Sequence, residues 1–103
     1  MKLQKSFGKR KSPKLPFVRR VSGTSMMPRY RQGQIVVAWP SKNFAIGDTI
    51  VLLHDGREKI KRIAAIDNET VYILGDNAQA STDSRHFGWI ASSCIRGKII
   101  WPL

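Results

Sequence analysis

The sequence is poor in the residues that build metal clusters and disulfide frameworks: its 103 residues include one cysteine and two histidines. The single cysteine, Cys94, cannot form an intramolecular disulfide, and it is compatible with a reducing compartment. Free cysteine usually packs as a small apolar side chain, so we expect Cys94 in the core. We expect neither a metal ion nor a cofactor.

Long apolar runs are missing as well. The two longest, residues 35–39 and 50–53, fall far short of the roughly 18–20 residues that a membrane span requires, and no stretch suits a secretory signal. We therefore expect a soluble, cytoplasmic protein. Its length fits one small domain.

Residues 1–20 contain no acidic residue but eight of the 18 Lys and Arg, so +8 of the formal net charge of +11 lies there. With Pro13 and Pro16, this segment is predicted to be a poorly ordered basic arm whose last few residues could join a strand. Residues 21–103 are nearly balanced at +3 and are predicted to form the folded, catalytic domain. The arm is suited to peripheral contact with an anionic membrane surface or an acidic partner.

Beyond the arm, short runs rich in Val, Ile and aromatic residues alternate with turn signals. Asp55-Gly56 is a strong hairpin signal because glycine adopts a positive φ at little cost. No segment shows a long period of 3.6, so the pattern is typical of a mostly β fold, a small antiparallel β-barrel or β-sandwich. The predicted strands are residues 17–21, 34–39, 49–54, 58–66, 70–74 and 97–101.

Two polar segments, residues 22–28 and the long connection 75–88, are the first places to look for a site. Ser25 is expected in a tight turn, where its hydroxyl and its backbone N–H could serve as a nucleophile and an oxyanion donor. A Ser/Thr-rich turn that caps a short helix before Pro28 is the simpler interpretation of the same residues.

A serine nucleophile needs a base, and histidine is poorly placed to supply it. His54 is expected to be an exposed residue at a hairpin, and His86 lies in the polar connection. By residue type alone, either histidine could complete a Ser-His-Asp triad with Asp76 or Asp83. The position expected for each histidine does not favour such a triad.

Lysine is the alternative base, and it acts only when burial keeps its amine neutral. Lys61 is the best placed, because strand alternation puts it on the same face as the apolar Ile63. Without further information, a solvated strand lysine is the simpler interpretation.

Four segments together resemble the catalytic motifs of the signal peptidase I family, and they occur in that family's order. The resemblance covers the chain from about residue 21 to its end. It implies a small, β-rich fold and a serine endopeptidase. The segments are residues 22–28 (SGTSMMP), 60–62 (IKR), 75–77 (GDN) and 81–88 (STDSRHFG).

The resemblance also implies roles for individual residues. Ser25 would be the nucleophile and Lys61 the general base of a Ser/Lys dyad, and the backbone N–H of Ser25 would supply the oxyanion donor. Ser81 would orient the Lys61 amine. The remaining implied roles are an ion pair of Asp83 with both Arg85 and Arg62, and a shallow pocket for small substrate side chains lined by Met26 and Ile60.

Some departures from the family narrow the expectation. Some members have a serine two positions before the nucleophile, whose hydroxyl is an extra oxyanion donor. That position is Gly23 here, so an oxyanion hole made of backbone N–H groups alone is implied. We also expect neither the membrane anchor nor the inserted β-domain of many members. The C-terminal half is similar to the compact maturation proteases of nickel-containing superoxide dismutase. These remove a leader from a precursor protein, here expected to be the nickel superoxide dismutase precursor.

Three alternatives stay open. One is a general signal-peptidase-like processing protease, and another is a self-cleaving regulator, for which the arm leaves no room for a helix-turn-helix. The third is a basic β-barrel that binds nucleic acid or an anionic surface. We expect no nucleic-acid partner, because the charge lies mostly on the arm and no strand alternates basic and aromatic residues.

Overall fold

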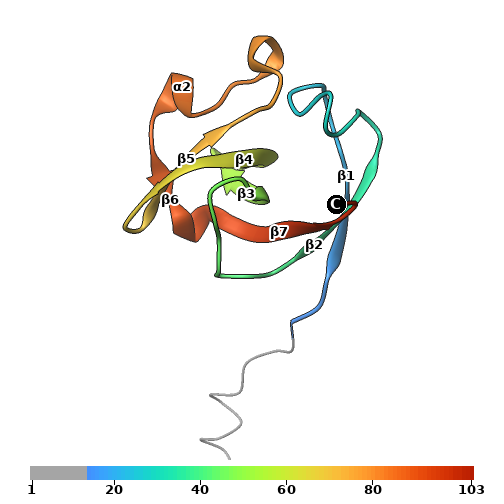
Figure 1. Ribbon diagram of the computed structural model, residues 1–103, viewed down its shortest axis with the longest axis horizontal. Helices are drawn as coiled ribbons and strands as arrows, with labels where there is room; N and C mark the ends of the chain where they lie inside the picture. The colour runs from blue at the N-terminus through green and yellow to red at the C-terminus, as the bar shows by residue number, and fades with distance from the viewer. Residues whose placement is uncertain (1–13) are drawn as a thin grey trace, which may run out of the picture.

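The structure, a computed structural model, describes residues 14–103. Within them the chain is mostly β, and its helices are single turns (Figure 1). The strands are β1 (Phe17–Arg20), β2 (Ile35–Trp39), β3 (Thr49–His54), β4 (Arg57–Asp67), β5 (Thr70–Leu74), β6 (Ile90–Ala91) and β7 (Ile95–Trp101). The short helices are η1 (Ala78–Ala80), α2 (Ser84–Phe87) and η2 (Ser92–Cys94).

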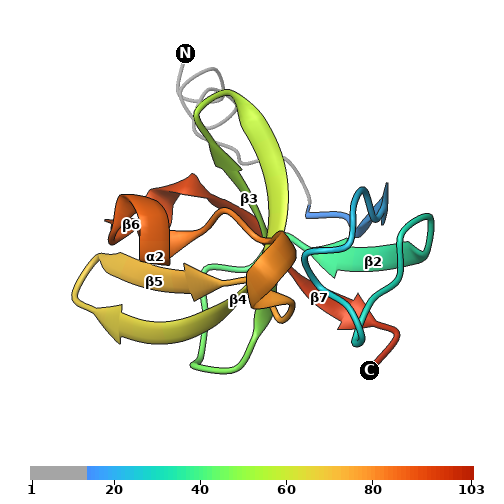
Figure 2. The same ribbon diagram turned by 90° about the horizontal axis from the view of Figure 1, so that it is seen from above.

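The seven strands form one antiparallel sheet in the order β1-β2-β7-β3-β4-β5-β6. The last strand, β7, lies between β2 and β3 and so joins the two halves of the sheet. Figure 2 shows β2 and the C-terminal end of β7 on one side of the molecule, and β5, β6 and α2 on the other. The predicted mostly β, antiparallel fold is confirmed.

Strand β3 separates two hydrophobic clusters. Its side chains alternate, so Val51 packs in one cluster while Ile50 and Leu52 pack in the other. This explains why β3 is a nearly continuous apolar run. The first cluster also contains Val21, Met26, Tyr30, Val36, Ala38 and Ile99, and the second also contains Ile63, Val71, Ile73 and Ile90.

All six predicted strands match observed ones within two residues at each end, and the Asp55-Gly56 hairpin joins β3 to β4 with a positive φ at both residues. The short β6 and the two helical turns inside residues 75–88 were not predicted. Strand β1 falls within the segment predicted as an arm, and residues 1–13 lie outside the described residues. In the described part, no helix is long and apolar enough to span a bilayer.

Two expectations about single side chains were wrong. His54 is not an exposed hairpin residue: its ring packs against that of Phe87, with 4.3 Å between the ring centroids, and only 18% of its side chain is exposed. Cys94 is half-buried rather than part of either core cluster. It lies in η2, a turn that leads into β7, where the chain runs near the surface.

Candidate active site

A cleft of about 320 Å³ runs between the segment that follows β1 and the first half of β4. One wall consists of residues 19–26, and the other of residues 57–61. Ala80 and Thr82, from the long connection after β5, complete the lining. The cleft therefore brings together the two polar segments that the sequence singles out and the strand that carries Lys61.

Ser25 lies in a run of turns between β1 and β2 and is half-buried. The turn is closed by backbone hydrogen bonds from Met27 N to Thr24 O at 3.1 Å and from Tyr30 N to Met26 O at 2.9 Å. Met26 and Tyr30 anchor this turn to the fold, because both side chains are buried in the first hydrophobic cluster. The tight turn expected for Ser25 is present, and the described residues contain no helix before Pro28.

Lys61 projects from β4 on the same face as Ile63, and only 5% of it is exposed. Its amine Nζ donates a hydrogen bond to Ser81 Oγ at 2.9 Å, the contact that the resemblance implies. Burial lowers the pKa of the Lys61 amine below its ordinary value, although the nearby Asp83 carboxylate acts in the opposite direction. The solvated strand lysine considered as an alternative is therefore not what the structure shows.

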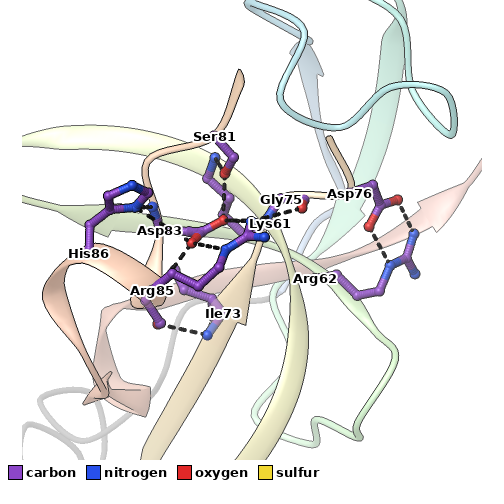
Figure 3. Close-up of polar contacts among 10 residues, drawn as sticks. Lys61, Arg62, Ile73, Gly75, Asp76, Ser81, Asp83, Arg85 and His86 are labelled. Carbon is purple, nitrogen blue, oxygen red and sulfur yellow. Dashed lines mark hydrogen bonds and ion pairs between the residues drawn. The ribbon is translucent and has the colours of Figure 1, made fainter. Parts of the chain in front are cut away.

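The Asp83 carboxylate is the centre of the polar network beside Lys61 (Figure 3). It is fully buried, and it accepts hydrogen bonds from Ser81 Oγ at 2.6 Å and from the Gly75 backbone N–H at 2.8 Å. Arg85 forms an ion pair with it, with donors at 2.9 and 2.5 Å. The Ser81 hydroxyl has one hydrogen, which it donates in the hydrogen bond to Asp83. Its oxygen can therefore only accept a hydrogen bond from the Lys61 amine. In this network Lys61 donates to Ser81, Ser81 donates to Asp83, and Arg85 donates to Asp83 from the other side.

Asp83 also caps helix α2. Its Oδ1 accepts from the Arg85 backbone N–H at 3.1 Å, and His86 Nδ1 accepts from the Asp83 backbone N–H at 3.2 Å. His86 is thus a partner in a capping box, and neither it nor His54 lines the cleft. The histidine-based triads considered from the sequence have no support in this arrangement.

The charge on Asp83 is expected to stabilise the fold. Burial alone would raise the pKa of Asp83, but hydrogen bonds from Arg85, Gly75 and Ser81 outweigh burial and hold that pKa well below its usual range. A carboxyl with a lowered folded-state pKa contributes stability above its unfolded pKa, near about pH 4, and loses it as the pH falls toward the folded value. Asp83→Asn should therefore reduce the free energy of unfolding by about 2–3 kcal/mol at neutral pH.

Urea unfolding at neutral pH and in acid checks this expectation, with Asp67→Asn, at an exposed residue near the end of β4, as the control. The Asp83→Asn variant should lose less stability than the native protein when the pH is lowered. An equal acid loss in the two proteins would mean that Asp83 does not act this way.

One implied contact was wrong: Arg62 does not pair with Asp83. Its Nε and Nη2 instead donate to the two carboxylate oxygens of Asp76 at 2.8 and 2.7 Å, and its Nη1 donates to Gly47 O. The reason is strand alternation, since successive residues point to opposite faces and Asp83 lies on the face of Lys61. Figure 3 shows the two pairs apart from each other.

Sequence reasoning missed how the connection after β5 is attached to the Ser25 turn. The Asn77 backbone N–H donates to Ser25 O at 2.8 Å, and Asn77 Nδ2 donates to Thr24 O at 3.1 Å. Gly75 lies against the Ser25 carbonyl oxygen and against the Ser81 side chain. The signal for this attachment was the Gly-Asp-Asn sequence, whose glycine and asparagine suit close backbone contact.

Gly75 leaves no room for a side chain. A Cβ built there would lie 2.2 Å from Ser81 Oγ and 2.8 Å from Ser25 O. We expect Gly75→Ala to push these two residues apart and to lower kcat/KM for peptide cleavage by about 10²-fold, the usual cost of misplacing a reacting group by about 1 Å. Peptide hydrolysis assays measure this effect. Unchanged activity in Gly75→Ala would contradict the geometry.

The residues expected to line a substrate pocket have different exposures. Met26 and Ile60 both line the cleft, one from each wall. Met26 is fully buried and forms the floor, while Ile60 is half-buried and packs against the same core cluster. An apolar floor close to Ser25 suits a small, uncharged substrate side chain.

The arrangement contains the parts of an acyl-transfer site that does not use histidine: a serine in a constrained turn, a buried amine in the same cleft, and groups that orient that amine. Within residues 14–103, no group of three His, Cys, Asp or Glu side chains is placed to hold a metal ion.

Comparison with known proteins identifies the family of the chain. A partial match is 57% identical over 35 residues to the mitochondrial ATP-independent inner membrane protease subunit 1a of Arabidopsis thaliana, and it covers 31% of this chain and 21% of that relative. The model of the family described as "Peptidase S24-like" matches residues 1–99. The chain therefore belongs to the Peptidase S24-like family.

Proposed function

We propose that the protein is a serine endopeptidase that works with a Ser/Lys dyad, Ser25 as the nucleophile and Lys61 as the general base. The observation that carries the proposal is the buried Lys61 amine, which has a lowered pKa and shares one cleft with Ser25. A neutral amine in that position is the base that a serine hydroxyl requires.

The hydrogen bonds around Lys61 leave its lone pair available. Ser81 Oγ accepts a hydrogen bond from the amine, so the nitrogen lone pair can point into the cleft and accept the proton of the Ser25 hydroxyl. The serine oxygen then attacks the scissile carbonyl, and the backbone N–H of Ser25 stabilises the negative charge that develops on the carbonyl oxygen.

The Lys61 ammonium then returns the proton to the departing amine, and the peptide bond breaks to leave an acyl ester on Ser25. In the second half, Lys61 accepts a proton from a water molecule as the water oxygen attacks the ester carbonyl. The acyl bond to Ser25 Oγ then breaks, and the Lys61 ammonium returns a proton to that oxygen. Ser81 orients the amine throughout, and the pair of Asp83 with Arg85 fixes Ser81. Arg62 supports the same connection indirectly, through Asp76.

The substrate we propose is a precursor protein with an N-terminal leader, and the most specific candidate is the precursor of nickel superoxide dismutase. The basis is the similarity of residues 74–102 to the compact maturation proteases. A general leader-processing protease is the second candidate, favoured by the similarity to a mitochondrial inner membrane protease subunit.

Incubation of the purified protein with a nickel superoxide dismutase precursor and with a secretory precursor tests both candidates. New amino termini are identified by mass spectrometry, with Ser25→Ala as the inactive control. One new terminus in the dismutase precursor supports the specific candidate, and cleavage of the secretory precursor alone supports the general one. Cleavage of neither precursor, or equal cleavage by the control, would contradict the proposed function.

A further inference from the structure

The cleft has a strong excess of positive charge. Among the described residues that line it, one is acidic and five are cationic. Lys61 is the proposed base, so four cations remain for other roles. The acidic residue is Glu58, and the other cations are Arg19, Arg20, Arg57 and Lys59.

Glu58 and Arg19 form an ion pair that joins the two walls of the cleft. Arg19 comes from β1 and Glu58 from β4, and three other strands separate these two in the sheet. Arg19 Nε donates to Glu58 Oε1, and Arg19 Nη2 donates to Glu58 Oε2 at 3.1 Å. The pair is therefore a bidentate contact of a guanidinium with a carboxylate. An extended peptide bound in the cleft would contact it.

The protein holds the Arg19 guanidinium in place independently of Glu58. Its carbon Cζ lies 4.7 Å from the centroid of the Phe17 ring, and its Nη1 donates to Val18 O at 2.9 Å. Strand alternation puts Phe17 and Arg19 on the same face of β1. The side chain of Arg19 is still 42% exposed, so an incoming carboxylate can reach it.

We propose that Arg19 is a specificity-determining residue that binds the carboxylate of an acidic substrate residue near the scissile bond, at the place that Glu58 occupies without substrate. The inference rests on the proposed peptidase function and names its substrate class, an acidic peptide. Arginine matches a carboxylate with two parallel hydrogen bonds, which gives direction as well as attraction.

The position of the acidic residue follows from the length of the wall. Arg19 precedes Ser25 by six residues, and an extended chain advances about 3.3 Å per residue, so the two are at most about 20 Å apart. The acidic residue should therefore lie within about six residues of the cleaved bond.

The test uses a set of peptides that share one cleavable sequence and carry a single Asp, or a single Asn, at each position within six residues of the bond. For the native protein, kcat/KM should be about tenfold higher with Asp than with Asn at one position, the size expected for one added charge-assisted hydrogen bond. Arg19→Gln should bring this ratio close to one. Glu58→Gln should increase the ratio, because it removes the competing carboxylate.

Arg20→Gln is the matched control. Arg20 lines the same cleft and carries the same charge, but it donates to Gly33 O at 2.9 Å and points to the other face of β1. The Asp to Asn ratio should survive in this variant. Loss of the ratio equally in Arg20→Gln and Arg19→Gln, or its absence in the native protein, would overturn the proposal.

Peptide binding to Ser25→Ala separates this proposal from the proposed function. Fluorescence anisotropy should show tighter binding of the Asp peptide, and Arg19→Gln should remove the difference. Binding preference without cleavage by the native protein would support the role of Arg19 and contradict the peptidase. Cleavage without any preference would do the reverse.

Discussion

Replacement of Ser25 by alanine is expected to lower kcat/KM for peptide cleavage by about 10⁴-fold or more, the loss seen when a serine nucleophile is removed. The Ser25 hydroxyl would carry the covalent intermediate. Of the two described serines that line the cleft, Ser22 and Ser25, only Ser25 lies in the constrained turn. Quantitative assays of the native and variant proteins measure the effect.

The same change should leave the fold intact. Ser25 is half-buried, and its turn is anchored by Met26, Tyr30 and backbone hydrogen bonds that alanine preserves. The free energy of unfolding should change by no more than about 0.5 kcal/mol. Ser22→Ala, at an exposed serine on the same wall, is the matched control and should retain activity. Activity that survives in Ser25→Ala would exclude this residue as the nucleophile.

Lys61→Met should abolish cleavage to a similar extent, since methionine fills the same space and offers no base. A Ser25→Ala and Lys61→Met double variant should be no worse than either single variant, because the two residues act as one unit. In the native protein kcat/KM should rise with pH as Lys61 loses its proton, and the rise should be centred below the ordinary lysine value because burial lowers this pKa.

Stability gives a second readout for Lys61. When burial lowers the folded-state pKa of a lysine, the unfolded chain binds more protons, so stability rises with pH from the folded value to about 10.4. Lys61→Met removes this segment of the pH dependence and should be neutral or stabilising at neutral pH. An unfolding free energy that falls sharply at neutral pH would indicate that the amine stabilises the fold as a charged group.

Lys59→Met is the control for both readouts. Lys59 lies on the same face of β4 as Lys61, but its amine is 3.2 Å from His54 Nδ1 and 5.0 Å from the centre of the Phe87 ring. Its charge contributes to the lowering of the Lys61 pKa. The variant should remain active, and its rate should rise at a slightly higher pH.

The sequence predicted the strands well because their signals are local. Residues 50–53 are continuously apolar, and Asp55-Gly56 adopts the positive φ values that a tight hairpin needs. It did not predict β6, which has only two residues and exists by pairing with β5. Nor did it predict α2, whose four residues depend on the capping box between Asp83 and His86. Both depend on contacts between parts of the chain rather than on local preference.

At the site, alternation along β4 indicated which face Lys61 shares with Ile63, but not how deeply the amine is buried. Depth depends on the connection after β5, which folds back over the amine through Ser81 and Gly75. The partner of Arg62 could not be predicted either, since Asp76 and Asp83 are both nearby in sequence and only the fold decides between them. The contact of the basic arm with an anionic surface or an acidic partner stays a prediction.

Trapping of the acyl intermediate tests the central claim, a Ser25 nucleophile activated by Lys61, most directly. A peptide ester of the cleaved sequence is mixed with the protein, the reaction is quenched in acid, and the acylated residue is located by proteolysis and mass spectrometry. We predict an acyl group on Ser25 that forms faster as the pH rises and is absent in Lys61→Met. Cleavage with the acyl group on another residue, or Ser25 acylation that is equally fast without Lys61, would contradict it.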